Sequence, residues 1–306
     1  MIRHKKSDDE LLKILAEYRL LDLAQITALH FSGRQVAARR MSQLVEAGLA
    51  QGITKVQGRK RGRPERLFTL GPAGIERLRE IGVLPHTLPL DRITGESLVH
   101  VQEHHLLVNW FRIHLGQIEN DLPNLETRFL TTTSPFFPSQ ANPCLRVEVP
   151  VPGSENDSIL FTPDGIFTVT DRDQEKTVLF YLEVDMGTET LVSSQVETKD
   201  IRQKVINYQS CFKSEIYKRC EQIWRHRLNG FRLLFLTHNA TRMAEICRLA
   251  QAMKPSNFIW ITERERMFEE GLAGTIWARG GHMDQPCQSI LGKNIYRRSP
   301  VLPDGL

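Results

Sequence analysis

Three acidic residues, Asp164, Glu183 and Asp185, have the side-chain type and the spacing of a site that could hold a divalent metal ion. Asp164 follows Pro163 at the start of one predicted strand, and Glu183 and Asp185 lie two residues apart on the next one. Because side chains alternate along a strand, Glu183 and Asp185 point to one face, where Asp164 can join them. Clustered carboxylates repel one another unless a cation lies among them, and such oxygen ligands suit Mg²⁺ or Mn²⁺. A cation held there could activate water or bind a scissile phosphate.

Each of these carboxylates also has a plainer explanation. Asp164 after Pro163 could simply be a turn residue. Glu183 and Asp185 stand among apolar neighbours on their strand, and partly buried carboxylates need partners. A metal ion is one such partner, and a basic side chain is another. The type and spacing of these residues therefore predict a carboxylate site and leave its partner open.

A long predicted helix, over about 193–214, could bring a basic and an aromatic side chain to the carboxylates. Lys204 and Tyr208 lie one turn apart on it. Lys204 could be a salt-bridge partner of the strand carboxylates or a catalytic group. Tyr208 could be a nucleophile, although its place on an apolar stripe favours packing in the core.

The elements that must position these residues form a mixed α/β pattern over residues 98–306, which we predict as one domain. A helix over about 97–118 opens this region, and short strands separated by turn residues follow it. The predicted strands are 126–132, 145–149, 159–161, 165–170, 178–185, 231–236 and 258–261. The last two are buried strands that come after the long helix, with a further helix between them.

Residues 1–82 have the pattern of a winged helix-turn-helix DNA-binding domain. Apolar spacing predicts helices over about 8–19, 22–30, 34–46 and 71–79, and strands over 49–56 and 66–70. On the third helix, the side expected to face the core carries Val36, Ala37, Met41, Leu44 and Val45. The other side carries residues that could read base edges or hold phosphate: Arg34, Gln35, Arg39, Ser42 and Gln43.

The turn between the two predicted strands of this domain is strongly basic. Arg59, Lys60, Arg61 and Arg63 lie there between Gly58 and Pro64, with Gly62 among them. Their charges repel one another and have nothing to bury, so a position beside phosphates or in a minor groove would suit them. A charge run by itself is usually a solvated loop. Because this run follows a helix-turn-helix pattern, we predict a wing that contacts DNA.

The charge of the chain is unevenly divided. The 306 residues carry 40 Lys and Arg against 36 Asp and Glu, and the formal net charge is +4. Residues 1–100 hold 17 basic and 11 acidic side chains, so the front third is basic and the remainder is slightly acidic. The 41% hydrophobic and 25% charged composition excludes a disordered or fibrous protein. We place a linker at residues 83–97, which contain two prolines and no sustained period.

Targeting and redox signals are weak in this sequence. It has no apolar run long enough for a spanning helix, and its start lacks the apolar segment of a secretory signal. We therefore expect a cytoplasmic protein with no membrane partner. The five cysteines are scattered without a C-x-x-C pair, which favours buried thiols over a disulfide framework or a cysteine zinc site.

The acidic motif resembles the signature of the PD-(D/E)XK nuclease superfamily. Pro163-Asp164 is followed at a suitable distance by Glu183-Val184-Asp185, where the superfamily has Glu-x-Lys. The resemblance implies a restriction-endonuclease-like fold with Mg²⁺ or Mn²⁺ on Asp164, Glu183 and Asp185. Because Asp185 stands where the lysine is expected, the cation that would steady an attacking water or the phosphate must come from elsewhere or be missing. Lys199 and Lys204 on the next helix are the candidates.

The whole pattern also resembles a narrower family, the replication-relaxation family. The residues that carry this resemblance are the winged helix, His104-His105-Leu106-Leu107-Val108, Pro163-Asp164-Gly165, Leu182 to Thr190, and Lys204 with Tyr208. The family is found on plasmids and other mobile elements, and part of it is similar to MobC-type mobilization relaxases. The resemblance implies a protein of α+β class, with an N-terminal winged helix-turn-helix followed by a PD-(D/E)XK-type domain.

Two functions from different classes fit this sequence. In the first, the protein is a metal-dependent endonuclease or relaxase: the winged helix binds a specific duplex site, and Asp164, Glu183, Lys204 and Tyr208 supply the catalytic groups that nick one strand. In the second, it is a non-catalytic DNA-binding regulator or relaxosome accessory factor, whose nuclease-like domain serves for dimerization or contact with other relaxosome or replication proteins. A cation bound at Asp164 and Glu183 would favour the enzyme, and a closed ion pair between Lys204 and Glu183 would favour the regulator.

Overall fold

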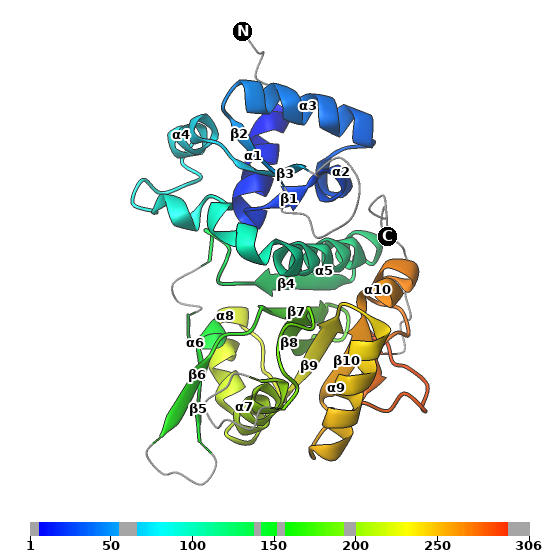
Figure 1. Ribbon diagram of the computed structural model, residues 1–306. Coiled ribbons are helices and arrows are strands. Elements are labelled where there is room, and N and C mark those ends of the chain that lie inside the picture. The colour runs from blue at the N-terminus through cyan, green and yellow to red at the C-terminus, as the bar shows by residue number, and fades with distance from the viewer. Residues whose placement is uncertain (1–5, 55–65, 138–141, 152–156, 193–199, 293–306) are drawn as a thin grey trace. The chain divides into compact units, whose positions relative to one another are not determined.

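The computed structural model describes residues 6–54, 66–137, 142–151, 157–192 and 200–292, and these form a mixed α+β protein (Figure 1). The described residues fall into two compact units. The first contains the residues up to 113 together with 132–137, and the second contains 114–131 and the residues from 142 to 292. The division falls inside helix α5 (Gln102–Asp121). Residues 83–97, the expected linker, lie within the first unit.

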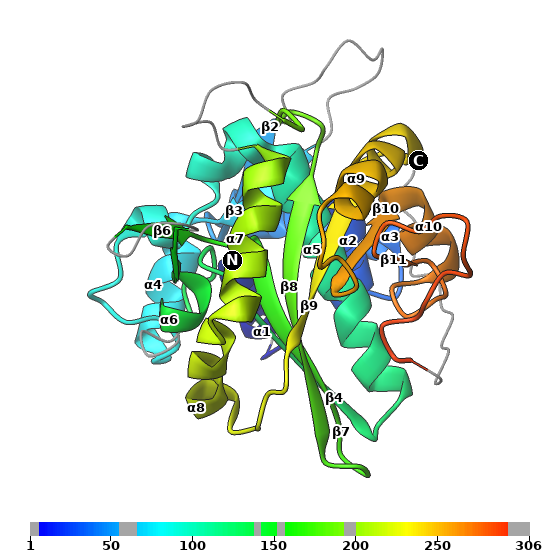
Figure 2. The same cartoon turned by 90° about the horizontal axis from the view of Figure 1, so that it is seen from below.

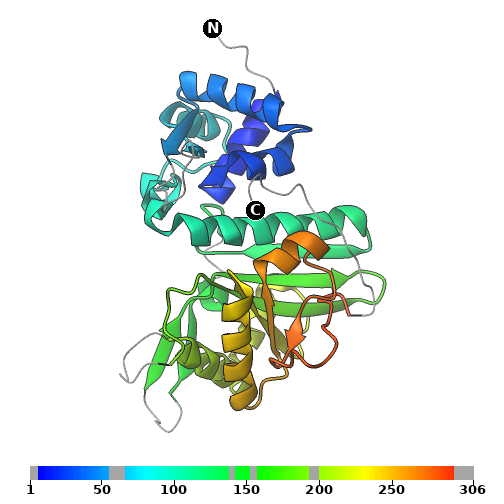
Figure 3. The same ribbon diagram turned by 45° about the vertical axis from the view of Figure 1, so that its right-hand side comes forward.

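The first unit has helices and strands close to the predicted ranges, with one short strand in addition. The helices are α1 (Lys6–Tyr18), α2 (Leu23–His30), α3 (Arg34–Glu46) and α4 (Pro72–Glu80), and two 3₁₀ turns, η1 (Leu90–Arg92) and η2 (Glu96–Val101), precede α5. Strands β1 (Leu21–Asp22), β2 (Ala50–Thr54) and β3 (Arg66–Leu70) form an antiparallel sheet in the order β1-β3-β2. Helices α1 to α3, drawn in blue, cluster together (Figure 3). The sequence did not predict β1, since a two-residue strand has no periodicity.

Local signals set the ends of α2 and α3. The Asp22 side chain accepts a hydrogen bond from the backbone N of Gln25 at 2.7 Å, and the Gln25 side chain accepts one from the backbone N of Asp22 at 3.3 Å. This reciprocal capping box satisfies two N–H groups at the start of α2. Gly48 follows α3 with φ of +69°, a left-handed conformation that suits a residue without Cβ. The helices pack around a core of leucines, including Leu11, Leu12 and Leu44.

Several charged side chains of the first unit hold its helices together. Arg40 on α3 donates from Nε to Asp8 of α1 at 2.8 Å. Arg77 on α4 binds both carboxylate oxygens of Asp9 at 2.9 Å. His105 on α5 is buried and bonded at 2.7 Å to a carbonyl oxygen at the end of α1. Burial lowers the pKa of His105 to about 4. These contacts attach α3, α4 and α5 to α1.

The second unit is built on a mixed six-stranded sheet in the order β11-β10-β9-β8-β7-β4. Strands β8, β9 and β10 are parallel, and the other pairings in this sheet are antiparallel. The strands are β4 (Leu125–Leu130), β7 (Gly165–Asp171), β8 (Lys176–Asp185), β9 (Phe231–Thr237), β10 (Ile259–Glu263) and β11 (Ala278–Arg279), and β5 (Val147–Pro150) with β6 (Ser158–Phe161) forms a separate antiparallel ribbon. The helices are α6 (Asn142–Leu145), α7 (Ile201–Lys213), α8 (Glu221–Trp224), α9 (Ala240–Ala252) and α10 (Arg264–Glu270), with η4 (Ile216–Cys220). Each predicted strand is present and the β7–β8 hairpin is confirmed, whereas α10 and β11 were not predicted.

Alternation along β8 separates two layers of side chains. Phe180 stacks on Phe167 of β7, with ring centroids 4.6 Å apart. Tyr181 points to the other face, where it contacts Tyr208 of α7. Helices α7 and α9, which lie in the connections from β8 to β9 and from β9 to β10, cover one face of the sheet (Figure 2). Glu183 is two residues from Tyr181 and points to the same face, so its partners come from this face.

Two expectations about the chain can be checked in the described ranges. All five cysteines are free thiols, and four of them are buried, as predicted. In the part of the chain that the structure describes, no helix is both long and apolar enough to cross a membrane.

Candidate nucleic-acid interface and carboxylate site

The predicted DNA-reading side of α3 is largely open to solvent. Arg34, Gln35, Arg39 and Ser42 are exposed, while Ala37, Met41 and Leu44 are buried on the opposite side. Gln43 differs from the other predicted contacts, since it is half-buried and its Oε1 accepts a hydrogen bond from Arg40 at 2.7 Å. The helix therefore presents four of the five predicted polar residues outward.

One residue of α3 lies on a different side from the one predicted. Val36 was expected to face the core, but it is 45% exposed. Successive residues of a helix are turned by about 100°, so Val36 lies well to one side of the stripe that Ala37, Met41 and Leu44 define. Val45 flanks the other edge of this stripe and is half-buried. The apolar stripe is narrower than the sequence suggested, and the outward face of α3 is correspondingly wider.

The basic turn predicted as a wing lies outside the described residues. Its members Arg59, Lys60, Arg61 and Arg63 fall within 55–65. The strands that flank it, β2 and β3, pair antiparallel from Ala50 with Leu70 to Thr54 with Arg66. DNA contact by these four residues stays a prediction.

In the second unit, Asp164, the residue before β7, is held beside the carboxyl end of β8. Its backbone N donates to the carbonyl of Leu182 at 3.1 Å, and its Oδ2 accepts from the backbone N of Val184 at 2.7 Å. These two bonds bracket Glu183 on β8. The carboxylate of Asp164 is thereby fixed near that of Glu183, and its negative charge contributes to a raised Glu183 pKa.

Glu183 is buried, and both of its carboxylate oxygens accept hydrogen bonds from α7. Lys204 Nζ lies 3.0 Å from Oε2, and the Tyr208 hydroxyl donates to Oε1 at 2.6 Å. Burial raises the pKa of Glu183 to about 7, although Lys204 and Tyr208 favour its charged form. A carboxyl group with that pKa is partly protonated at neutral pH.

Lys204 binds a second carboxylate that the sequence analysis did not assign to the site. Its Nζ lies 2.9 Å from Glu189 Oε2 as well as 3.0 Å from Glu183. Burial alone would lower the pKa of Lys204, but the charges of Glu183, Asp164 and Glu189 together raise it. The ammonium group therefore stays charged and is shared between the carboxylates of Glu183 and Glu189.

Tyr208 is fully buried at the base of this network. Its ring packs against Tyr181 and Phe161, with centroids 5.4 Å and 4.9 Å away. Burial raises its pKa well above the ordinary value, and so does the neighbouring Glu183. A phenolate nucleophile is therefore strongly disfavoured, and the side chain combines the core packing that was favoured from the sequence with a hydrogen bond to Glu183.

Asp185, the third expected metal ligand, is paired with an arginine instead. Arg242 on α9 makes a close ion pair from Nε to Asp185, and its Nη2 lies 3.4 Å from the other oxygen. That second oxygen also accepts a hydrogen bond from Gly187 N at 3.1 Å. Arg242 additionally donates to the carbonyl of Glu189 at 2.6 Å. Asp185 and Arg242 are both buried, so they neutralise each other in the interior of the unit.

As arranged, these residues do not form the expected three-carboxylate ligand set for Mg²⁺ or Mn²⁺. Asp185 is occupied by a guanidinium group, and Glu183 is bound to an ammonium group and a hydroxyl. Over the ranges that the structure describes, no group of three or more His, Cys, Asp or Glu side chains is placed to hold a metal ion. A divalent cation at Glu183 would have to compete with Lys204, whose charge repels it.

Arg242 and Glu189 are the site residues that the sequence analysis missed. Glu189 stands in the Leu182–Thr190 run that carries the family resemblance, but the sequence analysis gave it no role in the site. Arg242 is 57 positions from Asp185, so no local spacing connects them. The available signal was a basic residue in the first turn of a helix that follows a parallel strand, where carboxyl ends of strands meet helix starts.

Comparison with known proteins identifies the family. No curated protein and no solved structure matches the chain. A model of the replication-relaxation family matches residues 12–224, which include α3, β7, β8 and α7 but end before Arg242. Because the match covers more than half of the sequence, the chain belongs to the replication-relaxation family.

Proposed function

We propose that the protein is a sequence-specific DNA-binding protein that acts in the replication or mobilization of a plasmid or another mobile element. One observation carries this proposal: α3 divides its basic residues, turning Arg40 inward to Asp8 and leaving Arg34 and Arg39 exposed. Arg39 forms no ion pair with any residue of the described ranges. Family membership supports the link to mobile elements. In this proposal the first unit is a winged helix-turn-helix with α3 in the major groove.

The second unit, in this proposal, is a restriction-endonuclease-like domain that serves as an accessory to DNA binding. Each carboxylate of the predicted metal site accepts a hydrogen bond from a protein donor: Asp164 from Val184 N, Glu183 from Lys204 and Tyr208, and Asp185 from Arg242. The closed contact between Lys204 and Glu183 is the arrangement expected of a regulator. The unit would then contact other replication or relaxosome proteins, or a second copy of the chain, in the cytoplasm.

Cleavage of one DNA strand is the second candidate function, and one observation favours it. Lys204 lies beside Glu183, and Asp164 is close enough to act on the pKa values of both. Two carboxylates and a lysine, the residue types of the nuclease signature, are therefore brought together although position 185 is not lysine. Lys204 would hold a phosphate oxygen, and Asp164 with Glu183 would hold Mg²⁺ or Mn²⁺ if Lys204 moved away. This candidate needs a rearrangement that the regulator does not.

Duplex binding tests the first proposal. The full chain is mixed with a pool of random-sequence duplexes, and the bound duplexes are recovered, sequenced and used to measure affinity. We expect Arg39→Ala to weaken binding of the selected duplex by about 5- to 150-fold, the loss of one base contact. Lys13→Ala is the matched control, because Lys13 is an exposed cation on α1 and its loss changes the charge equally. Equal effects of the two variants, or no selected sequence, would refute recognition by α3.

Incubation with supercoiled plasmid distinguishes the regulator from the nuclease. A plasmid that carries the selected site is incubated with protein and Mg²⁺ or Mn²⁺, and nicked circles are counted by gel electrophoresis. The regulator predicts no nicking and unchanged duplex affinity in Glu183→Gln. Nicking that is lost in Glu183→Gln would overturn this part of the proposal and establish the enzyme.

A further inference from the structure

Two arginines that have no acidic partner among the described residues lie in a hollow at the amino-terminal ends of β8 and β9. The hollow has a volume of about 370 Å³ and is lined by Arg232, Arg279, Asn229 and Asn257 among others. Arg232 is the second residue of β9, and Arg279 ends β11. Glu183 is near the opposite, carboxyl end of β8, so the hollow is separate from the carboxylate site.

The charges of this hollow are unbalanced. In the described part of the chain, neither Arg232 nor Arg279 forms an ion pair with a carboxylate. The Arg232 guanidinium lies 4.4 Å from the centroid of the Trp260 ring and is half-buried, while Arg279 is exposed and donates to the Asn257 carbonyl at 3.3 Å. Burial and then the charge of Arg279 lower the pKa of Arg232. Two like charges held together without an acid would gain from a bound anion.

An aromatic side chain stands beside these cations. Phe212, near the end of α7, is 37% exposed and lines the hollow. Its ring stacks on Phe258, with centroids 5.2 Å apart and planes at 19°. The Tyr217 ring lies near-parallel to it as well, with centroids 6.1 Å apart and planes at 28°. The part of this large apolar ring that stays open to solvent offers a contact surface for another flat ring.

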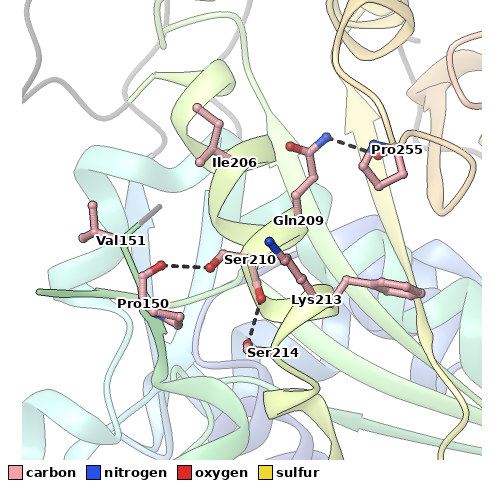
Figure 4. A pocket seen from close by; sticks show the side chains of 9 residues that line it. Pro150, Val151, Ile206, Gln209, Ser210, Lys213, Ser214 and Pro255 are labelled. Carbon is pink, nitrogen blue, oxygen red and sulfur yellow. Dashed lines mark hydrogen bonds between the residues drawn. The ribbon is translucent and has the colours of Figure 1, made fainter. Parts of the chain in front are cut away.

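Phe212 also lines a second hollow of about 650 Å³, which crosses α7 between Pro150 and Pro255 (Figure 4). Gln209 donates to the Pro255 carbonyl at 3.1 Å, and Ser210 donates to the Pro150 carbonyl at 2.8 Å, so both walls are tied to α7. Lys213 lines this hollow too, is exposed, and has no acidic partner within the described ranges. The two hollows therefore share Phe212, and on both sides of it they place cations that form no ion pair within the described part of the chain.

We propose that the two hollows together form a groove that binds single-stranded DNA. The groove is defined by Arg232, Arg279, Phe212 and Lys213. The cations would hold successive phosphates, and Phe212 would stack on an unpaired base. A duplex keeps its base faces inside the helix, so the exposed ring favours a single strand. The choice of DNA as the polyanion rests on the proposed function, in which the first unit brings the protein to a DNA site.

The test uses the full chain and a fluorescent oligothymidylate of about 12 nucleotides, with affinity measured by anisotropy over a range of salt concentrations. We expect Arg232→Gln with Arg279→Ala to weaken binding and to reduce the slope of log affinity against log salt by about 1.4, or 0.7 for each phosphate contact. Phe212→Ala should weaken binding by about 5- to 150-fold and leave the slope unchanged. Arg248→Ala is the control, because Arg248 is an exposed arginine elsewhere on this unit.

Further arms keep the test decisive. Arg279→Glu reverses a charge at an exposed position, so it still tests the groove if Arg232→Gln fails to fold. Wild-type affinity and slope in both Arg279→Glu and Phe212→Ala would overturn the proposal. It would also be overturned if polyglutamate of equal charge bound as tightly, with the same dependence on Arg279, because the groove would then be a site for acidic peptides. Arg39→Ala should bind oligothymidylate normally, so failure of duplex recognition is distinguishable from failure of the groove.

Discussion

Helix α3 of the first unit and the carboxylate site of the second unit use their cations in different ways. On α3 of the first unit, Arg39 is open to solvent and Arg40 beside it is bound to Asp8. In the carboxylate site of the second unit, Lys204 and Arg242 both turn inward to acids. The first unit thus offers positive charge to an anion from outside, whereas the carboxylate site has already neutralised its own. Residue type alone does not tell an exposed cation from a paired one. The difference depends on whether an acidic side chain lies opposite the cation in the fold.

The largest expected effect tests whether the second unit depends on that neutralisation. Arg242→Met would leave Asp185 buried without its guanidinium, and we expect the free energy of unfolding to fall by about 3–5 kcal/mol. Denaturant titration of the full chain measures it. The double variant Asp185→Leu with Arg242→Met removes both charges and should recover most of the loss. A loss below about 1 kcal/mol in Arg242→Met would contradict a self-neutralised interior, since removing a buried partner should cost more.

A smaller effect, which depends on pH, tests the same idea at Glu183. Its pKa is about 7 in the folded protein against the ordinary 4.5, so between these pH values the folded state holds more protons on this group than the unfolded state does. The free energy of unfolding contributed by Glu183 therefore falls as pH rises through this window. At about 1.4 kcal/mol per unit the change is roughly 3 kcal/mol.

Glu183→Gln lacks this titration, so the comparison uses the difference between variant and wild type. We expect the variant to gain about 3 kcal/mol of stability relative to wild type from pH 4.5 to pH 7, whatever its offset at one pH. Denaturant titrations at several pH values give this difference, and groups that titrate equally in both proteins cancel. If the stability difference between the variant and the wild type does not vary with pH, Glu183 is fully ionised over this range. An ionised Glu183 would be the form expected of a metal ligand.

The smallest expected effect compares one helix start in each unit. Asp22 caps α2 by accepting from Gln25 N, and Asp200 caps α7 by accepting from Gln203 N, both at 2.7 Å. Replacement by alanine should cost about 0.5–2 kcal/mol in each case. Because α7 carries Lys204, only Asp200→Ala should also change the pH dependence that Glu183 produces. If the pH dependence of stability is unchanged in Asp200→Ala, the position of Lys204 does not depend on this helix cap.

Short-range patterns predicted most of the fold. The limits of α3 follow from its apolar spacing and from Gly48, and the β7–β8 hairpin follows from alternation with turn residues between the strands. The Tyr208 and Lys204 contacts with Glu183 were among the alternatives that the sequence left open. In each case the outcome depends on residues close together in the sequence, or on which face of a strand the side chain occupies.

What the sequence missed depends on residues far apart in the chain. Strand β11 needs β10 as its neighbour, and Asp185 meets Arg242 only because β8 and β9 are parallel, which brings the start of α9 beside the end of β8. Val36 was misplaced because the width of the buried stripe depends on what packs against α3. Arg232 and Arg279 gave no signal as a pair, since they become neighbours through β10.

The Asp185–Arg242 contact also has an evolutionary consequence. Asp185 lies inside the part of the chain that matches the family model, and Arg242 lies beyond the end of that match at residue 224. An acid buried at 185 is tolerated only with a cation supplied from α9. Among relatives, the two positions should therefore change together: a chain without a basic residue at the start of this helix should also have lost the acid at the end of β8.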